Sequence, residues 1–154
     1  MMRPRFALDS NILIYAEGAQ DEVKRDVAVS LVKRLGPGAG LLPLQAAGET
    51  LRWLMSRGRL TRRDAVDRIK AWCERCMLLP MTSAAFDQAL ELIGANGFQV
   101  WDAVILSACA EARADVLLSE DMQHGFSWRG VIIVNPFVLS SGELLELIPQ
   151  RPLH

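Results

Sequence analysis

The stretch Phe6-Ala7-Leu8-Asp9-Ser10-Asn11-Ile12-Leu13-Ile14-Tyr15 reads as a short buried strand that turns directly into a helix. Three apolar residues lead to Asp9, and the apolar spacing after Ser10 is helical. In open parallel α/β sheets, ligands bind beyond the carboxyl ends of the strands, so the Asp9 carboxylate is expected at a binding edge. The simpler alternative is that Asp9 only caps the following helix by accepting hydrogen bonds from its free amides.

Length and composition fit one globular domain spanning residues 1–154, with 51% apolar and 23% charged residues. The formal charge of −1 excludes a global positive field that would attract nucleic acid regardless of geometry. Three cysteines argue against a disulfide framework, and the C-x-x-C pair Cys73 and Cys76 has no second pair to complete a zinc site. Without a signal-peptide pattern or a long apolar run, we expect a cytoplasmic protein and no membrane span.

Strands that alternate with helices predict a three-layer α/β/α sandwich around a mainly parallel sheet. Continuous apolar runs at 116–118 and 131–134 are typical of parallel strands, which are buried on both faces. Further extended segments are expected at 5–9, 40–44 and 77–80. Helices are expected from 11 onward and at 21–35, 45–57, 61–76, 82–93, 101–112 and 142–148, and those at 45–57 and 61–76 would form a helical hairpin.

Two acids besides Asp9 adjoin predicted elements of the sheet edge. Asp121 follows the apolar strand at 116–118, where an ordinary turn residue would be equally natural. Asp102 precedes a helix that is apolar almost all round. The alternative for Asp102 is a helix N-cap, with Trp101 and Leu106 forming a hydrophobic staple.

Glu49 is the fourth candidate, on the predicted helix at 45–57. Its alternative is an exposed ion pair with Arg52, three residues further on. If all four carboxylates met in one pocket, they would repel and could not all stay ionised without a cation. Carboxylate oxygens select Mg²⁺ or Mn²⁺. Such an ion can activate water and neutralise charge on phosphate, so this grouping indicates metal-dependent phosphodiester hydrolysis.

Basic residues outnumber acids between positions 52 and 75. The candidates for contacts to RNA phosphates are Arg57, Arg59, Arg62 and Arg63. The alternative is a basic helical face that is simply solvated.

Four segments together resemble the PIN domain: Asp9-Ser10-Asn11-Ile12-Leu13, Glu49, Trp101-Asp102-Ala103 and Leu118-Ser119-Glu120-Asp121-Met122-Gln123-His124-Gly125. The combination is similar to the VapC type of bacterial toxin ribonuclease, over nearly the whole chain. The resemblance implies a PIN-like sandwich, Mg²⁺- or Mn²⁺-dependent endoribonuclease activity on RNA, a VapB-like antitoxin partner and a homodimer.

The resemblance also implies roles for individual residues. Asp9 and Asp102 would be the principal metal ligands, and Glu49 and Asp121 would complete the acidic site directly or through water. The supporting residues, which would orient these acids, are Asn11 and Ser119. The hairpin at 46–76 would lie near the RNA path or the antitoxin groove, and His124 is interpreted as structural. Ser10 is a mild departure, because the family more often has threonine after the first aspartate.

Two alternative functions are open at this point. A haloacid-dehalogenase-like phosphatase would use the aspartate after the first strand as a nucleophile, but that chemistry normally has a second aspartate at the position of Asn11. A PIN-fold protein that binds RNA or a partner without cleaving is the other alternative, and the presence of all four acids argues against it.

Overall fold

The computed structural model describes residues 3–149. The predicted single domain includes positions 1–2 and 150–154, which lie outside the described residues. Along the chain the elements are β1 (Phe6–Leu8), α1 (Ser10–Ala16), α2 (Glu22–Leu35), β2 (Gly40–Pro43), α3 (Leu44–Ser56), α4 (Arg62–Arg75), β3 (Met77–Leu79), α5 (Ser83–Asn96), α6 (Val100–Glu111), β4 (Val116–Leu118), β5 (Ser127–Trp128), β6 (Val131–Val134), a 3₁₀ turn (Pro136–Val138) and α7 (Ser141–Leu147).

The strands form one six-stranded sheet in the order β3-β2-β1-β4-β6-β5. Every neighbouring pair is parallel except β5 with β6. β1 is central, and Leu8 pairs with Leu118 of β4. The residues that follow these two strands therefore start at the same edge of the sheet.

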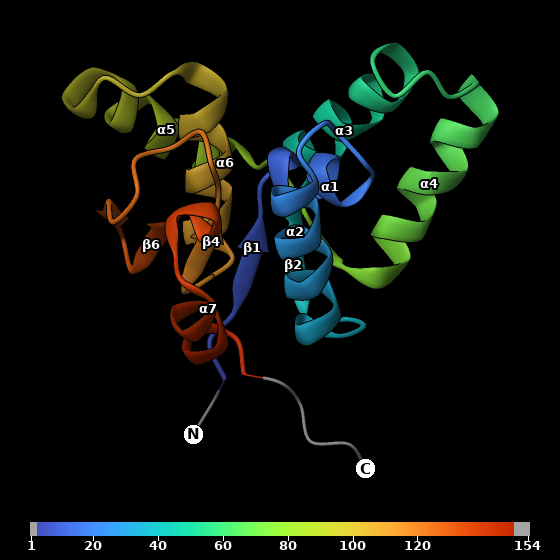
Figure 1. The fold of residues 1–154 in the computed structure, drawn as a ribbon. Coiled ribbons are helices and arrows are strands. Elements are labelled where there is room, and N and C mark those ends of the chain that lie inside the picture. Colours follow the sequence, from blue (N-terminus) through green and yellow to red (C-terminus); the bar gives the residue numbers. More distant parts are fainter. Residues whose placement is uncertain (1–2, 150–154) are drawn as a thin grey trace.

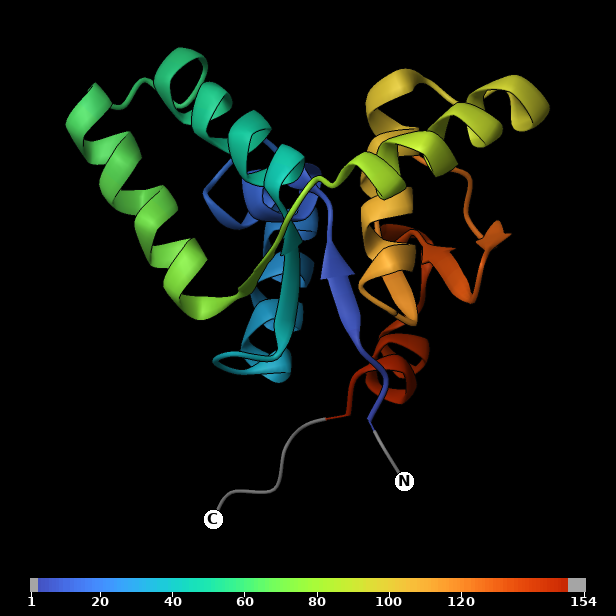
Figure 2. The same cartoon turned by 180° about the vertical axis from the view of Figure 1, so that it is seen from behind.

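Alternating side chains of the strands supply two hydrophobic cores, one on each face. Leu8 and Leu118 belong to the core that contacts α1 and α2. Ala7 and Leu117 belong to the core that contacts α5 and α6. Figures 1 and 2 show these helix groups on opposite sides of the central strand. This layering confirms the predicted three-layer α/β/α sandwich with a mainly parallel sheet.

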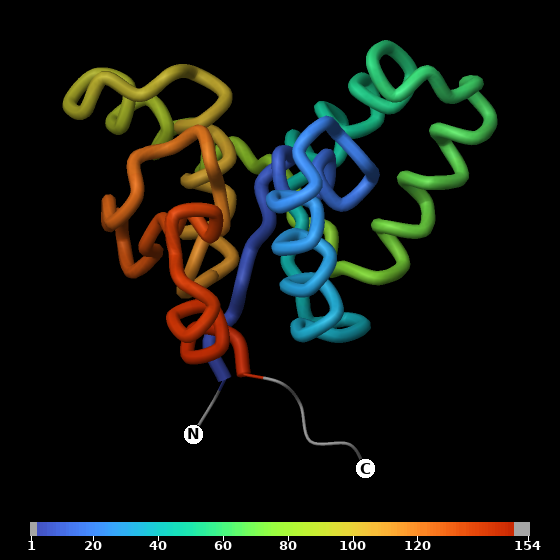
Figure 3. Tube along the Cα trace, in the orientation of Figure 1, coloured from blue at the N-terminus to red at the C-terminus, as the bar shows by residue number. Residues whose placement is uncertain are grey.

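The helical hairpin is also present, as α3 and α4. Thr61 caps α4 by accepting a hydrogen bond from the Asp64 amide at 3.1 Å, the contact typical of a threonine N-cap. The backbone trace shows α3 and α4 rising on one side of the end of β1, and α5 with α6 on the other (Figure 3). The carboxyl end of β1 thus lies between two helical pairs.

Two elements were not predicted. β5 is a two-residue strand that pairs with β6 in the antiparallel sense, next to Gly130 at φ 88°. Such a short strand has no apolar alternation to reveal it. The other is the 3₁₀ turn at Pro136–Val138, which Asn135 caps through the Phe137 amide. None of the helices in residues 3–149 combines the length and apolar character that a membrane crossing needs.

Packing of α6 against the sheet should dominate stability. Leu106 is fully buried on α6, whereas Leu90 on α5 is 51% exposed. Leu106→Ala should lower the free energy of unfolding by about 2–5 kcal/mol, because it removes buried methyl groups and leaves a cavity. Leu90→Ala, the matched control, should change it by less than about 0.5 kcal/mol. Urea denaturation of both variants measures the difference, and equal effects would contradict the assignment of the core.

Candidate active site

Asp9 lies directly beyond β1, at the sheet edge it shares with the end of β4. Its backbone amide donates to the Leu118 carbonyl at 3.0 Å, so the β1–β4 pairing continues into the site. The side chain is buried, and Oδ1 accepts a hydrogen bond from the Ser10 amide at 2.7 Å. Asp9 is therefore the N-cap of α1 as well as a candidate ligand. The two interpretations of Asp9 are compatible.

Ser119 and Asn11 join Asp9 to Asp121. The Ser119 hydroxyl donates to Asp9 Oδ2 at 2.7 Å and accepts from the Asp121 amide at 3.3 Å. The Asn11 amide nitrogen donates to Asp9 Oδ2 at 3.4 Å and to Asp121 Oδ2 at 3.2 Å. Its oxygen accepts from the Glu120 amide at 3.1 Å. Both residues predicted to support the acids therefore contact them.

Glu49 reaches the same site from α3. Its Oε2 accepts a hydrogen bond from the Ser10 hydroxyl at 3.3 Å. Its Oε1 is buried and has no hydrogen-bond partner among the described residues. No ion pair joins Glu49 to Arg52 within residues 3–149, so the exposed-pair alternative is wrong. A buried carboxylate oxygen without a partner is costly unless a further group completes it.

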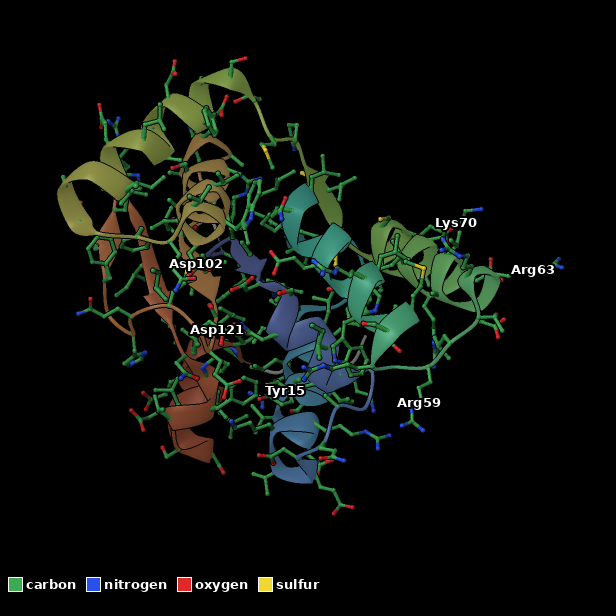
Figure 4. All side chains as sticks on the ribbon, turned by 90° about the horizontal axis from the view of Figure 1, so that it is seen from above. Tyr15, Arg59, Arg63, Lys70, Asp102 and Asp121 are labelled. Atoms are coloured by element: carbon green, nitrogen blue, oxygen red, sulfur yellow. The ribbon has the colours of Figure 1, made fainter. Side chains whose placement is uncertain are left out.

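Asp102 is not the N-cap of its helix. α6 begins at Val100 with Gln99 as the N-cap, and Asp102 lies inside the first turn. The N-cap interpretation of Asp102 is therefore wrong. Val100 and Trp101, which precede Asp102 in this turn, are exposed, 48% and 55%, so no buried apolar residue marks in the sequence where the helix begins. Asp102 and Asp121 face the same region in Figure 4.

Burial, reinforced by neighbouring negative charges, raises the pKa of three of the acids. Burial, followed by the charges of Asp9 and Asp121, raises the pKa of Asp102 to about 6. Burial and the charges of Asp9 and Asp102 raise the pKa of Glu49. Burial and the nearby Asp121 raise the pKa of Asp9, although hydrogen bonds from Ser119 and Ser10 oppose this shift. Burial alone would raise these pKa values, and the contributions from Asp9, Asp102 and Asp121 show that the carboxylates also repel one another.

The site offers oxygen ligands, which suit a hard divalent cation. No group of three or more acidic, histidine or cysteine side chains in residues 3–149 is already arranged as a metal cage. Mg²⁺ does not require one, because it usually keeps several waters and binds one or two carboxylates directly. The unpartnered Oε1 of Glu49 and the raised pKa values are the features that a cation would relieve. The donor set therefore fits Mg²⁺ or Mn²⁺.

A cleft of ≈ 790 Å³ adjoins the acids, with Glu49 and Asp121 in its lining. Of the four arginines predicted to contact RNA, Arg57 lines this cleft. The other three are exposed and lie outside its lining: Arg59, Arg62 and Arg63. Figure 4 shows Arg59 and Arg63 directed away from the labelled acids. The turn between α3 and α4 spreads these side chains, and Arg59 itself adopts a left-handed φ of 57°.

Several contacts around the site had no signal in the sequence. Lys24 from α2 pairs with Glu120, and its ammonium lies 5.3 Å from the centre of the Tyr15 ring. Trp53 and Arg68 line the cleft. These contacts join segments far apart in the chain, so periodicity cannot reveal them.

His124 makes a structural contact. Its Nδ1 accepts a hydrogen bond from the Asn135 amide at 2.9 Å, which ties the loop after β4 to the end of β6. This contact agrees with the structural interpretation of His124.

Comparison with known proteins gives a family and a set of similar folds. The PIN domain model matches residues 6–125, whereas no match was found among curated proteins. A toxin–antitoxin complex from Klebsiella pneumoniae contains a chain that is 16% identical, with a TM-score of 0.64, and the match covers 84% of this chain and 96% of the other.

Two further structures are similar. Mycobacterium tuberculosis VapC20, a sarcin-ricin loop cleaving toxin, is 16% identical with a TM-score of 0.61, and the match covers 75% of this chain and 89% of the other. VapBC2 from Rickettsia felis, bound to a promoter DNA fragment, is 14% identical with a TM-score of 0.59, over 83% of this chain and 96% of the other. At such identities these likenesses establish the fold. Together with the family match over most of the sequence, they show that this chain belongs to the PIN domain family.

Proposed function

We propose that this chain is a Mg²⁺- or Mn²⁺-dependent endoribonuclease and the toxin of a toxin–antitoxin pair. The observation that carries the proposal is the proximity of Asp9, Glu49, Asp102 and Asp121, whose charges act on one another: the pKa values of Asp9, Glu49 and Asp102 are all raised. Four oxygen donors from four elements suit a divalent cation better than any other ligand. Membership of the PIN domain family is consistent with this reading.

In this proposal each acid has a role. Asp9 and Asp102 are the principal metal ligands, and Glu49 and Asp121 complete the site directly or through water. A bound metal ion would supply a water nucleophile at neutral pH and offset the charge that develops on phosphate oxygens.

Two uncharged side chains that donate hydrogen bonds hold the acids in position for that ion. The hydroxyl of Ser119 and the amide of Asn11 both donate to Oδ2 of Asp9, which fixes the orientation of this buried carboxylate. Neither residue adds charge, so the pocket keeps its negative character. Asn11 also holds Asp121, which sets the spacing between two of the acids.

The toxin assignment rests on the similar structures. The structure from Klebsiella pneumoniae is a toxin–antitoxin complex, and VapC20 from Mycobacterium tuberculosis is a toxin that cleaves the sarcin-ricin loop. By analogy, the proposed partner is a VapB-like antitoxin, the proposed substrate is RNA, and the proposed assembly is a homodimer in the cytoplasm. The phosphatase alternative is weaker. Its second aspartate would stand at position 11, where this chain has an asparagine whose amide donates to Asp9 and Asp121.

Loss of ligand charge should abolish cleavage. Asp9→Asn and Asp102→Asn should each reduce Mn²⁺-dependent RNA cleavage by at least about 100-fold, because each removes one negative ligand. Asparagine keeps an acceptor oxygen for the α1 cap, so thermal melting should show a folded protein. Asp26→Asn, an exposed acid on α2, is the control. Undiminished cleavage by the purified Asp9→Asn/Asp102→Asn double variant would reject the mechanism.

The crowded acids should also weaken the metal-free fold. The pKa of Asp102 rises from 3.8 to about 6 on folding, so the folded state holds this proton more tightly than the unfolded chain. The contribution of Asp102 to stability therefore falls as pH rises across that window. In EDTA at about pH 7.5, Asp102→Asn should be more stable than wild type by on the order of 1 kcal/mol, after allowance for solvent screening.

Thermal melting tests this sign. The Tm of the variant should exceed that of wild type by about 2–4 °C in EDTA, and the gap should close near pH 4. Added Mn²⁺ should raise the Tm of wild type more than that of the variant. A variant that melts below wild type in EDTA at neutral pH would contradict the proposed repulsion.

Phosphate contacts should appear in the salt dependence of RNA binding. K is the association constant for RNA binding, and log K falls as log salt concentration rises. Arg57→Ala should make that slope shallower by about 0.7, the value for one phosphate contact on a single strand. The Arg62→Ala/Arg63→Ala double variant tests an outer track and should flatten the slope further. Arg113→Ala is the control, because Arg113 is exposed and lies just before β4 begins, at the opposite end of that strand from the acids. Identical slopes for all variants would exclude these arginines.

A further inference from the structure

The cleft beside the acids is larger than a metal ion needs. Its volume is ≈ 790 Å³, whereas six waters around a divalent ion occupy roughly 180 Å³. The excess is within the range of pockets that hold an organic ligand. The remaining space is bounded by α1 and the loop after it, by α3 and by Arg68 of α4, so side chains from these segments decide what lies next to the reacting phosphate.

One row of α3 runs from the acids along this cleft. Glu49, Trp53 and Arg57 are spaced by four residues, so they share one face of the helix, and all three line the cleft. Each step along the row is about 6 Å at 1.5 Å per residue. Moving outward from the proposed metal site, the wall presents a carboxylate, then an indole, then a guanidinium.

The turn that follows α3 packs closely against Trp53. The residue is half-buried, and a Cβ added at Gly58 would come within 3.1 Å of Trp53 Cζ3 and 2.9 Å of the Leu54 backbone. Only a residue without a side chain lets the indole and this turn pack so closely. An aromatic ring packed against its neighbours beside a charged cleft is the arrangement on which nucleobases stack.

Arg68 adds a second cation from α4. Its Nε lies 3.3 Å from Glu17 Oε2, and its side chain is 60% exposed. Glu17 is also held by the Trp72 indole nitrogen, which donates at 2.8 Å. This anchoring fixes the position of Arg68 and leaves most of its donors free. Arg57 has no ion-pair partner in the part of the chain that the structure describes.

We propose that Trp53, Arg57 and Arg68 bind the nucleotide next to the scissile phosphate, with its base stacked on Trp53 and its backbone phosphate at the two arginines. The inference rests on the proposed ribonuclease function and deepens it by naming the side chains that hold the substrate nucleotide. A base on Trp53 must leave its own stack, which a loop or single strand permits and a duplex resists. Trp53 and Arg68 are thus substrate-contacting residues that the four acids alone do not reveal.

The test combines substitutions in the protein with removal of single bases from the RNA. Binding is measured by fluorescence polarisation in the Asp102→Asn background, so that the RNA stays intact, and the probe is a labelled 12-nucleotide oligouridine. Trp53→Ala should weaken binding about 10-fold, and Trp53→Phe should restore most of it. Oligouridines with one abasic position moved along the strand should lose affinity at one position, and that loss should vanish in Trp53→Ala. Phe86→Ala, an exposed aromatic on α5, is the control.

Cleavage kinetics of the otherwise unmodified protein separate the inference from the function. Trp53→Ala should raise KM about 10-fold and leave kcat within about twofold, because the lost contact binds the ground and transition states alike. Arg68→Ala should likewise raise KM with little change in kcat. It should also make the fall of RNA affinity with salt concentration shallower. If wild type cleaves RNA and Trp53→Ala has the same KM and the same sensitivity to abasic positions, the inference about Trp53 fails while the ribonuclease proposal stands. If no RNA is cleaved yet binding depends on Trp53, the ribonuclease proposal fails and the binding site stands.

A duplex of the same length supplies the last comparison. Wild type should bind the single strand at least about 10-fold more tightly than the duplex, and Trp53→Ala should narrow that ratio. Equal binding of both forms by wild type would overturn the single-strand preference.

Discussion

Negative charge gathered at the carboxyl ends of β1 and β4 is the constraint around which this structure is built. Asp9 is buried there, and its carboxylate is satisfied by Ser10, Asn11 and Ser119 rather than by a cation of the protein. Burial and mutual repulsion make the ionised state unfavourable. A fold that keeps such a group in place without a neutralising side chain stores unfavourable energy, which is typical of a binding site.

The parallel sheet is what brings the acids together. Because β1 and β4 pair in register at Leu8 and Leu118, the residues after each strand emerge side by side. The helices then complete the pocket from opposite sides: α3 supplies Glu49, and the first turn of α6 supplies Asp102. Two helical pairs packed on two different cores therefore meet over one strand end.

The fold, rather than distance along the sequence, determines where the acidic and the basic side chains of this protein lie. Acids occupy the sheet edge, while the basic residues between 52 and 75 lie on a hairpin that rises beside it. Its turn spreads the arginines, so Arg57 lines the cleft while Arg63 points away from the acids. Residues of this basic run therefore do not all share one surface, because successive helical positions are 100° apart and the turn redirects the chain.

The sequence by itself determined the sandwich, because continuous apolar runs, caps such as Thr61 and alternating strands and helices are local signals of buried parallel strands and helix ends. It also indicated four acids and two polar supports by their positions after strands and by family resemblance. Only the tertiary structure decided that Asp102 lies inside its helix, that Glu49 bonds Ser10, that β5 pairs with β6, and that Trp53 and Arg68 form a wall of the cleft. These features are contacts between segments far apart in the chain, and their energies depend on distance and burial, which no local pattern encodes.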